Sequence, residues 1–158
     1  MNGLDPDQQF VMYAVRDMLT NCATFEEAKK YIETEQFLAR AYFTMVLPIY
    51  FSKGGVVVTR SYTAADNEAV TDTKDPNGWF VLQTNYDWNE PDAYLDQRTQ
   101  PGNKCMHQLG RKRVTREGIF QVMSSKPNLN KSTVYTTVME IDSGALYTFK
   151  QECKDPCW

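Results

Sequence analysis

Histidine, cysteine and long apolar runs are all scarce in this sequence, and each shortage excludes a class of protein. The chain has one histidine, His107, and four scattered cysteines, which are too few ligands for a zinc site. The longest apolar stretch, residues 41–51, is interrupted by Thr44 and Pro48 and is shorter than the roughly 20 residues that a membrane-spanning helix needs. We therefore expect no metal, no cofactor and no transmembrane segment, and we interpret residues 41–51 as core packing.

Positive charge is not in excess either. The chain has 17 lysines and arginines against 20 aspartates and glutamates, a formal net charge of −3. This balance gives no electrostatic footprint for nucleic acid, so we interpret the basic run at residues 111–113 as a solvated loop. Residues 1–7 are polar and acidic, without the basic segment and apolar stretch that are typical of a signal peptide.

What the chain does contain is enough apolar material for one core. Of its 158 residues, 42% are hydrophobic and 13% are aromatic, which is typical of a single globular domain or most of one. The sequence shows no internal repeat and no domain linker. We therefore expect residues 1–158 to form a single, incomplete domain.

Hydrophobic periodicity and turn residues predict the elements of this domain. Thr24 and Glu27 form a capping box for the second helix. The order of elements indicates an α+β fold with an antiparallel sheet and packed helices. We expect helices at 7–19, 24–33, 101–109 and 115–123, strands at 56–59 and 79–83 that pair with each other, a turn at 75–78, and a hairpin over 134–149.

A group of polar residues follows the predicted strand at 79–83. Asn85 has two N–H donors, carries no charge and does not titrate, so it is a candidate donor to a developing oxyanion. Arg98 would add a fixed positive charge. The alternative is that Asn85 and Asp87 only form a turn, which is the commoner role of these residues after a strand.

Six short motifs then follow one another in a specific order. They are TFEEAK at 24–29, ARAYF at 39–43, QTNYD at 83–87, LDQRT at 95–99, LNKSTVYTT at 129–137 and CKDPCW at 153–158. Together they resemble the acid ceramidase family, and the resemblance runs from about Met12 to the last residue. It covers only the C-terminal part of the family's β-subunit.

This resemblance implies an N-terminal-nucleophile hydrolase with an αββα sandwich, of which the chain would supply part. Such an enzyme splits N-acylsphingosine (ceramide) into sphingosine and a fatty acid, using a leading cysteine whose α-amino group is the base. The chain opens with Met1, so we expect the nucleophile, the α-subunit and the N-terminal part of the β-subunit to lie outside it. The chain alone should be inactive. Residues 41–51 would then be either core or a wall for acyl chains.

The cysteines fit the same resemblance. We expect a disulfide between Cys153 and Cys157, with two free thiols as the alternative, and the family pairs the position of Cys105 with the α-subunit. Cys22 is interpreted as an unpaired thiol, and Cys105 cannot form a dyad with His107, because residues two apart on a helix face different sides. These features imply a lysosomal or secreted protein.

Three further expectations come from the motifs. Asn130 begins an Asn-Lys-Ser sequon, which is a glycosylation acceptor in a secreted protein. The family's functional arginine falls on Arg98 when counted from Asn85, but on Gln97 when counted from Thr99. The resemblance also implies two partners, the lipid substrate ceramide and a sphingolipid activator protein. The alternatives are an N-acylethanolamine-hydrolysing acid amidase and a non-catalytic remnant of the scaffold.

Overall fold

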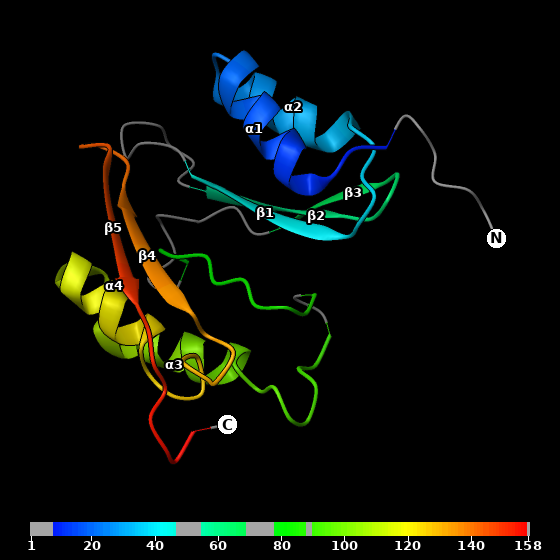
Figure 1. The fold of residues 1–158 in the computed structure, drawn as a ribbon. Helices are drawn as coiled ribbons and strands as arrows, with labels where there is room; N and C mark the ends of the chain where they lie inside the picture. The colour runs from blue at the N-terminus through cyan, green and yellow to red at the C-terminus, as the bar shows by residue number, and fades with distance from the viewer. Residues whose placement is uncertain (1–7, 47–54, 69–77, 88–89, 158) are drawn as a thin grey trace. The chain divides into compact units, whose positions relative to one another are not determined.

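The computed structural model of the protein describes residues 8–46, 55–68, 78–87 and 90–157. The chain divides into two compact units, Met1–Thr73 and Lys74–Trp158. Each unit combines helices with antiparallel strands (Figure 1). The predicted α+β class is therefore confirmed. No helix of the described residues is both long enough and apolar enough to cross a membrane.

The first unit is a three-stranded sheet with a helical layer. Helices α1 (Val11–Asn21) and α2 (Phe25–Thr34) lie over one face of the sheet (Figure 1). The strands are β1 (Ala41–Val46), β2 (Gly55–Arg60) and β3 (Ala65–Glu68), paired antiparallel in the order β1-β2-β3. The two predicted helices and the strand at 56–59 are thus confirmed.

Local signals explain where α2 begins and what it buries. The Thr24 hydroxyl accepts the Glu27 N–H at 3.2 Å, and the Glu27 carboxylate accepts the Thr24 N–H at 3.3 Å, which is the predicted capping box. Apolar residues at the two ends of α1 reach the surface, since Phe10 and Leu19 are 64% and 74% exposed. The buried cluster of this unit consists of Ala14, Ile32, Phe37, Phe43, Val56 and Val58.

The second unit is a pair of helices and a hairpin. Helix α3 (Thr99–Leu109) ends at Gly110, whose φ of +68° suits glycine. Helix α4 (Arg116–Met123) is capped by the Thr115 hydroxyl. Helix α3 contacts α4, and α4 contacts β4 (Tyr135–Glu140), which pairs with β5 (Ala145–Lys150). Both predicted helices and the hairpin are confirmed.

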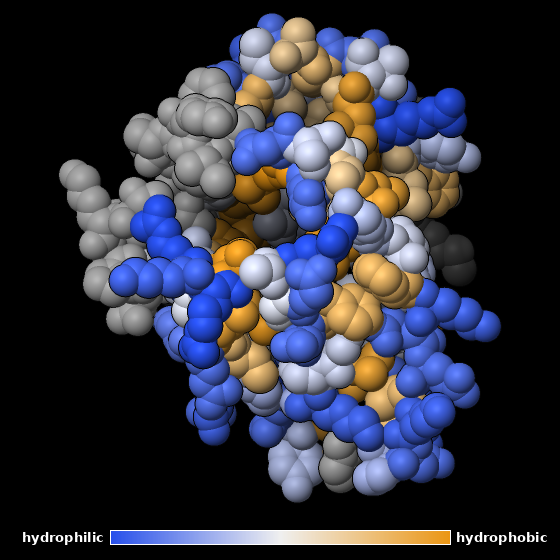
Figure 2. Space-filling model, turned by 90° about the vertical axis from the view of Figure 1, so that its left-hand side faces the viewer, coloured by the Kyte–Doolittle hydropathy of each residue, from blue (hydrophilic) through white to orange (hydrophobic). Residues whose placement is uncertain are grey.

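The hairpin buries one of its two faces. Thr136 and Val138 are buried, whereas Tyr135 and Met139, which alternate with them along β4, are more than 60% exposed, as the period of two in a strand requires. Apolar groups also reach the surface between polar ones on the face of the molecule drawn in Figure 2.

The predicted strand at 79–83 is wrong, and so is its pairing with 56–59. Residues 79–83 are half-buried and belong to no strand of the described part, and both edges of β2 are already occupied by β1 and β3. A tight turn from Ser61 to Ala64, closed by a 3.0 Å backbone hydrogen bond, connects β2 to β3 and so brings β3 to one of these edges. The expected turn at 75–78 and most of the second half of 41–51 lie outside the described residues.

The apolar run at 79–83 packs on helix α3 instead. A Cβ added to Gly102 would lie 2.8 Å from Leu82 Cδ1, so the helix approaches Leu82 closely at a residue without a side chain. The rings of Phe80 and His107 meet edge to face, with centroids 5.2 Å apart. Leu82 therefore packs against the first turns of α3, the helix that begins directly after Arg98.

Candidate functional site

Side-chain hydrogen bonds join residues 84–86 to residues 96–99. The hydroxyls of Thr84 and Thr99 are 2.7 Å apart, and the Tyr86 hydroxyl donates to Asp96 Oδ2 at 3.1 Å. Between these two contacts, Arg98 Nη2 donates to Asn85 Oδ1. We call these three contacts the side-chain ladder. It places Asn85 and Arg98, the two candidates from the sequence, in direct contact.

Asp96 fixes the guanidinium of Arg98. Arg98 Nε donates to Asp96 Oδ1 at 2.7 Å and Nη2 donates to Asp96 Oδ2 at 2.8 Å, a bidentate geometry that is stronger and more directional than a single contact. Arg98 in turn contacts the carboxamide oxygen of Asn85, so Asp96 fixes the guanidinium that makes this contact.

Asp92 fixes the backbone from which Arg98 projects. Its carboxylate accepts the backbone N–H groups of Arg98 at 2.7 Å and Thr99 at 2.6 Å, and also the Thr99 hydroxyl at 2.6 Å. The first N–H groups of a helix lack intrahelical partners and favour a negative charge. Sequence reasoning missed Asp92, Asp96 and Tyr86. An acidic residue shortly before a predicted helix was the available signal for Asp92.

The ladder changes the titration of its members. Hydrogen bonding from Arg98 holds the pKa of Asp96 below its ordinary value, since these contacts favour the carboxylate. Burial, followed by the hydrogen bond to Asp96, raises the pKa of Tyr86. These contacts favour the charged form of Asp96 and the neutral form of Tyr86.

A cleft of about 1160 Å³ lies next to the ladder. Its lining includes Asn85, Asp92, Asp96, Gln97 and Arg98 from one segment, and Pro127, Asn130, Ser132 and Thr133 from a second. The lining brings neutral amide donors and a guanidinium to one place, an arrangement that can stabilise negative charge developing on a bound oxygen. Of the two candidates for the arginine position, Arg98 donates a hydrogen bond to Asn85.

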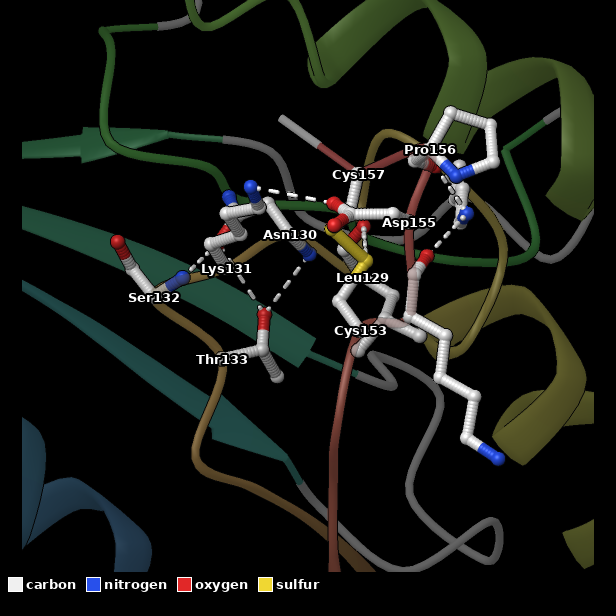
Figure 3. Close-up of a disulfide and its surroundings, with 11 residues drawn as sticks. Leu129, Asn130, Lys131, Ser132, Thr133, Cys153, Asp155, Pro156 and Cys157 are labelled. Atoms are coloured by element: carbon white, nitrogen blue, oxygen red, sulfur yellow. Dashed lines mark hydrogen bonds and ion pairs between the residues drawn. A yellow bond between two sulfur atoms is a disulfide. The ribbon is translucent and has the colours of Figure 1, made fainter.

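The second segment of the cleft wall is a turn around Asn130 (Figure 3). The Asn130 side-chain oxygen accepts the Ser132 N–H at 2.9 Å, and the Asn130 N–H donates to the Thr133 hydroxyl at 3.1 Å. Such a turn, in which an asparagine side chain bonds the backbone two residues on, is typical of this residue type. The sequon residue is therefore half-buried in the wall of the cleft.

None of the three hydrogen bonds of the side-chain ladder involves a cysteine. Cys153 and Cys157 form the expected disulfide, with Cα atoms 5.9 Å apart. Cys105 is a free thiol 3.6 Å from the Ser125 hydroxyl, whereas His107 faces Phe80, so the structure does not bring Cys105 and His107 together. Cys22, also free, belongs to the first unit.

The part of the chain that the structure describes contains no cluster of three or more histidine, cysteine, aspartate or glutamate side chains suited to a metal ion. The side chains of the ladder and of the cleft wall supply amide, guanidinium and hydroxyl groups. None of these groups is a strong nucleophile at neutral or acidic pH.

Comparison of the sequence with known proteins identifies relatives of this chain. No family model matches the chain. A probable acid ceramidase of Caenorhabditis elegans is 43% identical over 152 residues, and the human acid ceramidase is 36% identical over 152 residues. Both matches cover 96% of this chain but only 37% and 38% of the relatives. The chain thus spans little more than a third of their length.

A solved structure shows the same fold. The N-acylethanolamine-hydrolyzing acid amidase ortholog of Caenorhabditis elegans matches with a TM-score of 0.71 at 27% identity, covering 90% of this chain and 61% of that one. The expected partial fold of the N-terminal-nucleophile hydrolase type is therefore confirmed. Sequence and fold together place this chain in the acid ceramidase family.

Proposed function

We propose that this chain supplies the oxyanion-binding side of an amide hydrolase that splits N-acylsphingosine into sphingosine and a fatty acid. The observation on which the proposal rests is the contact between Arg98 and Asn85, with Arg98 held in turn by Asp96. A donor that is fixed before the reaction stabilises the transition state without reorganising. The similarity to acid ceramidases supports the choice of substrate.

In this mechanism the nucleophile is a cysteine thiol outside the residues of this chain. The thiol attacks the acyl carbon, and the carbonyl oxygen becomes an oxyanion that receives a hydrogen bond from the Asn85 carboxamide. The positive charge of Arg98 lies behind the carboxamide and polarises it. The amine then leaves, and water releases the fatty acid from the thioester.

The same proposal extends to compartment and partners. A disulfide between Cys153 and Cys157 is typical of a secreted or lysosomal protein. We propose that Cys105, a free half-buried thiol, pairs with a separate α-subunit, and that Asn130 is a glycosylation acceptor. A sphingolipid activator protein would deliver the lipid.

A chimera tests the catalytic role of Asn85. The matched segment of this chain replaces the corresponding 152 residues of the nematode relative, and fatty-acid release from labelled ceramide is measured. Removing one oxyanion donor costs about 100- to 1000-fold in kcat, so we expect Asn85→Ala to lose that much with little change in KM. Asn21→Ala, at an exposed asparagine that ends α1, is the matched control and should retain the parent rate.

Two outcomes would reject the proposal. One is a folded chimera that does not cleave ceramide, and the other is an Asn85→Ala variant within a few-fold of its parent. The 158-residue chain alone should release no fatty acid, and measurable turnover by it would contradict our placement of the nucleophile.

The solved structure that resembles this chain favours one rival substrate. That structure belongs to an N-acylethanolamine-hydrolyzing acid amidase ortholog, so N-palmitoylethanolamine is the competing substrate for the chimera. A higher kcat/KM for N-palmitoylethanolamine than for ceramide would select the amidase. No turnover of either, with both bound, would select a non-catalytic scaffold.

A further inference from the structure

The C-terminal disulfide closes a small ring that lies against the cleft wall. The ring spans Cys153 to Cys157, and we call it the tail ring. Figure 3 shows it next to the segment from Leu129 to Thr133. By the loop-closure argument, a ring this short constrains the unfolded chain less than a long one would. Its position in the fold therefore needs a local explanation.

Two lysines connect the tail ring to the two ends of one loop. At the start of the loop, the Lys126 ammonium donates to the carbonyl oxygens of Lys154, at 3.0 Å, and Pro156. Further along, the Lys131 ammonium lies 3.2 Å from Asp155 Oδ1. Both acceptor carbonyls lie inside the tail ring, so the closed ring sets the spacing of the oxygens that Lys126 binds.

A third contact lies between these lysines. Cys153 Sγ is 3.7 Å from the carbonyl oxygen of Leu129. Because a disulfide sulfur has no proton to donate, this is a packing contact and not a hydrogen bond. Leu129 is 9% exposed, so the ring contacts the loop at a residue whose side chain is buried. The tail ring thus touches residues 126, 129 and 131.

The residues between and after these contacts form the cleft wall. Pro127, Asn130, Ser132 and Thr133 line the same cleft as Asn85. We propose that the tail ring is a positioning element that holds this wall in place. The four wall residues act on whatever the cleft contains, and the ring acts only through them. The inference does not depend on which amide the site cleaves.

Four backbone amides report the state of the wall. The Leu129 N–H donates to Ser125 O, the Asn130 N–H to the Thr133 hydroxyl, the Ser132 N–H to the Asn130 side chain, and the Thr133 N–H to Asn130 O. Exchange of these four amides with deuterium measures local opening of the wall. The β4–β5 amides serve as the internal reference, because their backbone hydrogen bonds join these two strands to each other and not to the tail ring.

The decisive experiment compares two lysine variants of the full 158-residue chain by amide exchange. Lys126→Met removes the two hydrogen bonds but keeps the disulfide, and we expect exchange of the four wall amides to rise by about tenfold or more, with the β4–β5 amides unchanged. Lys154→Met is the matched control, because only the backbone carbonyl of this exposed residue takes part in the contact. It should behave as wild type.

Two further variants separate positioning from general stability. Lys126→Arg keeps a cationic donor and should restore much of the protection of the wall. The double change Cys153→Ser with Cys157→Ser opens the ring and should increase wall exchange as Lys126→Met does. The inference is overturned if Lys126→Met leaves wall exchange unchanged, or if wall and hairpin amides accelerate together. Neither result bears on ceramide cleavage, which the chimera tests separately.

Discussion

Each unit of the molecule contains an arginine with several hydrogen bonds, and the two are used differently. Arg60 is 1% exposed and donates to two carbonyl oxygens at the end of α2. The Arg98 side chain keeps 21% of its exposure and donates to the side chains of Asp96 and Asn85. Arg60 thus joins backbone segments of the first unit, whereas Arg98 holds the carboxamide of Asn85, a residue that lines the cleft.

The surroundings of Arg60 show what a structural arginine requires. Its guanidinium lies 5.1 Å from the centroid of the Phe37 ring, and burial lowers its pKa. The carbonyl oxygens and the ring offset part of the loss of water around the charge. Its Nε is buried without a hydrogen-bond partner among the described residues. These contacts indicate that Arg60 stabilises the fold of the first unit.

Replacing Arg98 should separate activity from stability most clearly. In the chimera, Arg98→Met removes both the charge and the contact that orients Asn85, and we expect kcat to fall by about 100-fold or more. Because the Arg98–Asp96 pair is partly exposed, the free energy of unfolding should change by about 1 kcal/mol or less. Arg98→Lys should restore little, since an ammonium cannot reproduce the bidentate contact. A full-rate Arg98→Met enzyme would contradict the assignment.

Replacing Arg60 should give the opposite result. Arg60→Met leaves two carbonyl oxygens at the end of α2 without their donor, and we expect a loss of about 2–3 kcal/mol in the free energy of unfolding. Urea unfolding of the 158-residue chain measures it. Arg16→Met, at an exposed position on α1, is the control and should stay within about 0.5 kcal/mol of wild type. Equal losses in the two variants would show that Arg60 is not a structural arginine.

The sequence predicted most of the regular structure because its local signals were complete. The capping box of Thr24 and Glu27, the glycine that ends α3 and the alternation of β4 each act within a few residues. The strand at 79–83 failed for the converse reason. An apolar run does not by itself specify its partner, and here Leu82 and Phe80 pack on α3, which a tertiary contact decides.

The candidate site was only partly predictable. The motifs led to Asn85 and Arg98, but counting residues could not decide between Arg98 and Gln97. The contact with Asn85 favours Arg98. Asp92 was missed because its hydrogen bonds run to backbone groups six and seven residues later, and the position of an acidic residue before a helix does not specify contacts at that separation.

Removing the partner of Arg98 should have an intermediate effect. Asp96→Asn keeps the charge of Arg98 but weakens the two contacts that hold its guanidinium, and we expect about a tenfold loss in kcat of the chimera. Asp142→Asn, at an exposed carboxylate in the turn of the β4–β5 hairpin, is the control and should retain the parent rate. An Asp96→Asn enzyme with the parent rate would show that Arg98 orients Asn85 without help.

The pH dependence gives an independent readout of the same contact. Because the folded pKa of Asp96 is depressed, the stability that the pair contributes is fully present above the ordinary aspartate pKa and is lost as the pH falls through the lower, folded value. Carboxyl NMR titration of the 158-residue chain should show Asp96 titrating below its ordinary value. Arg98→Met should raise that midpoint, and an unchanged midpoint would mean that Arg98 is not its main partner.

The smallest expected effect comes from the packing beneath the ladder. An added Cβ in Gly102→Ala would lie 2.8 Å from Leu82 Cδ1 and 3.4 Å from Asn128 Oδ1. The Leu82 contact is the end of a flexible side chain, which can turn away, and alanine favours the helix, so the net change in unfolding free energy should be under about 1 kcal/mol. Leu82→Ala with Gly102→Ala should remove the clash, and a double-mutant cycle measures the coupling. Additive effects would show that α3, and with it Arg98, is positioned without the apolar run at 79–83.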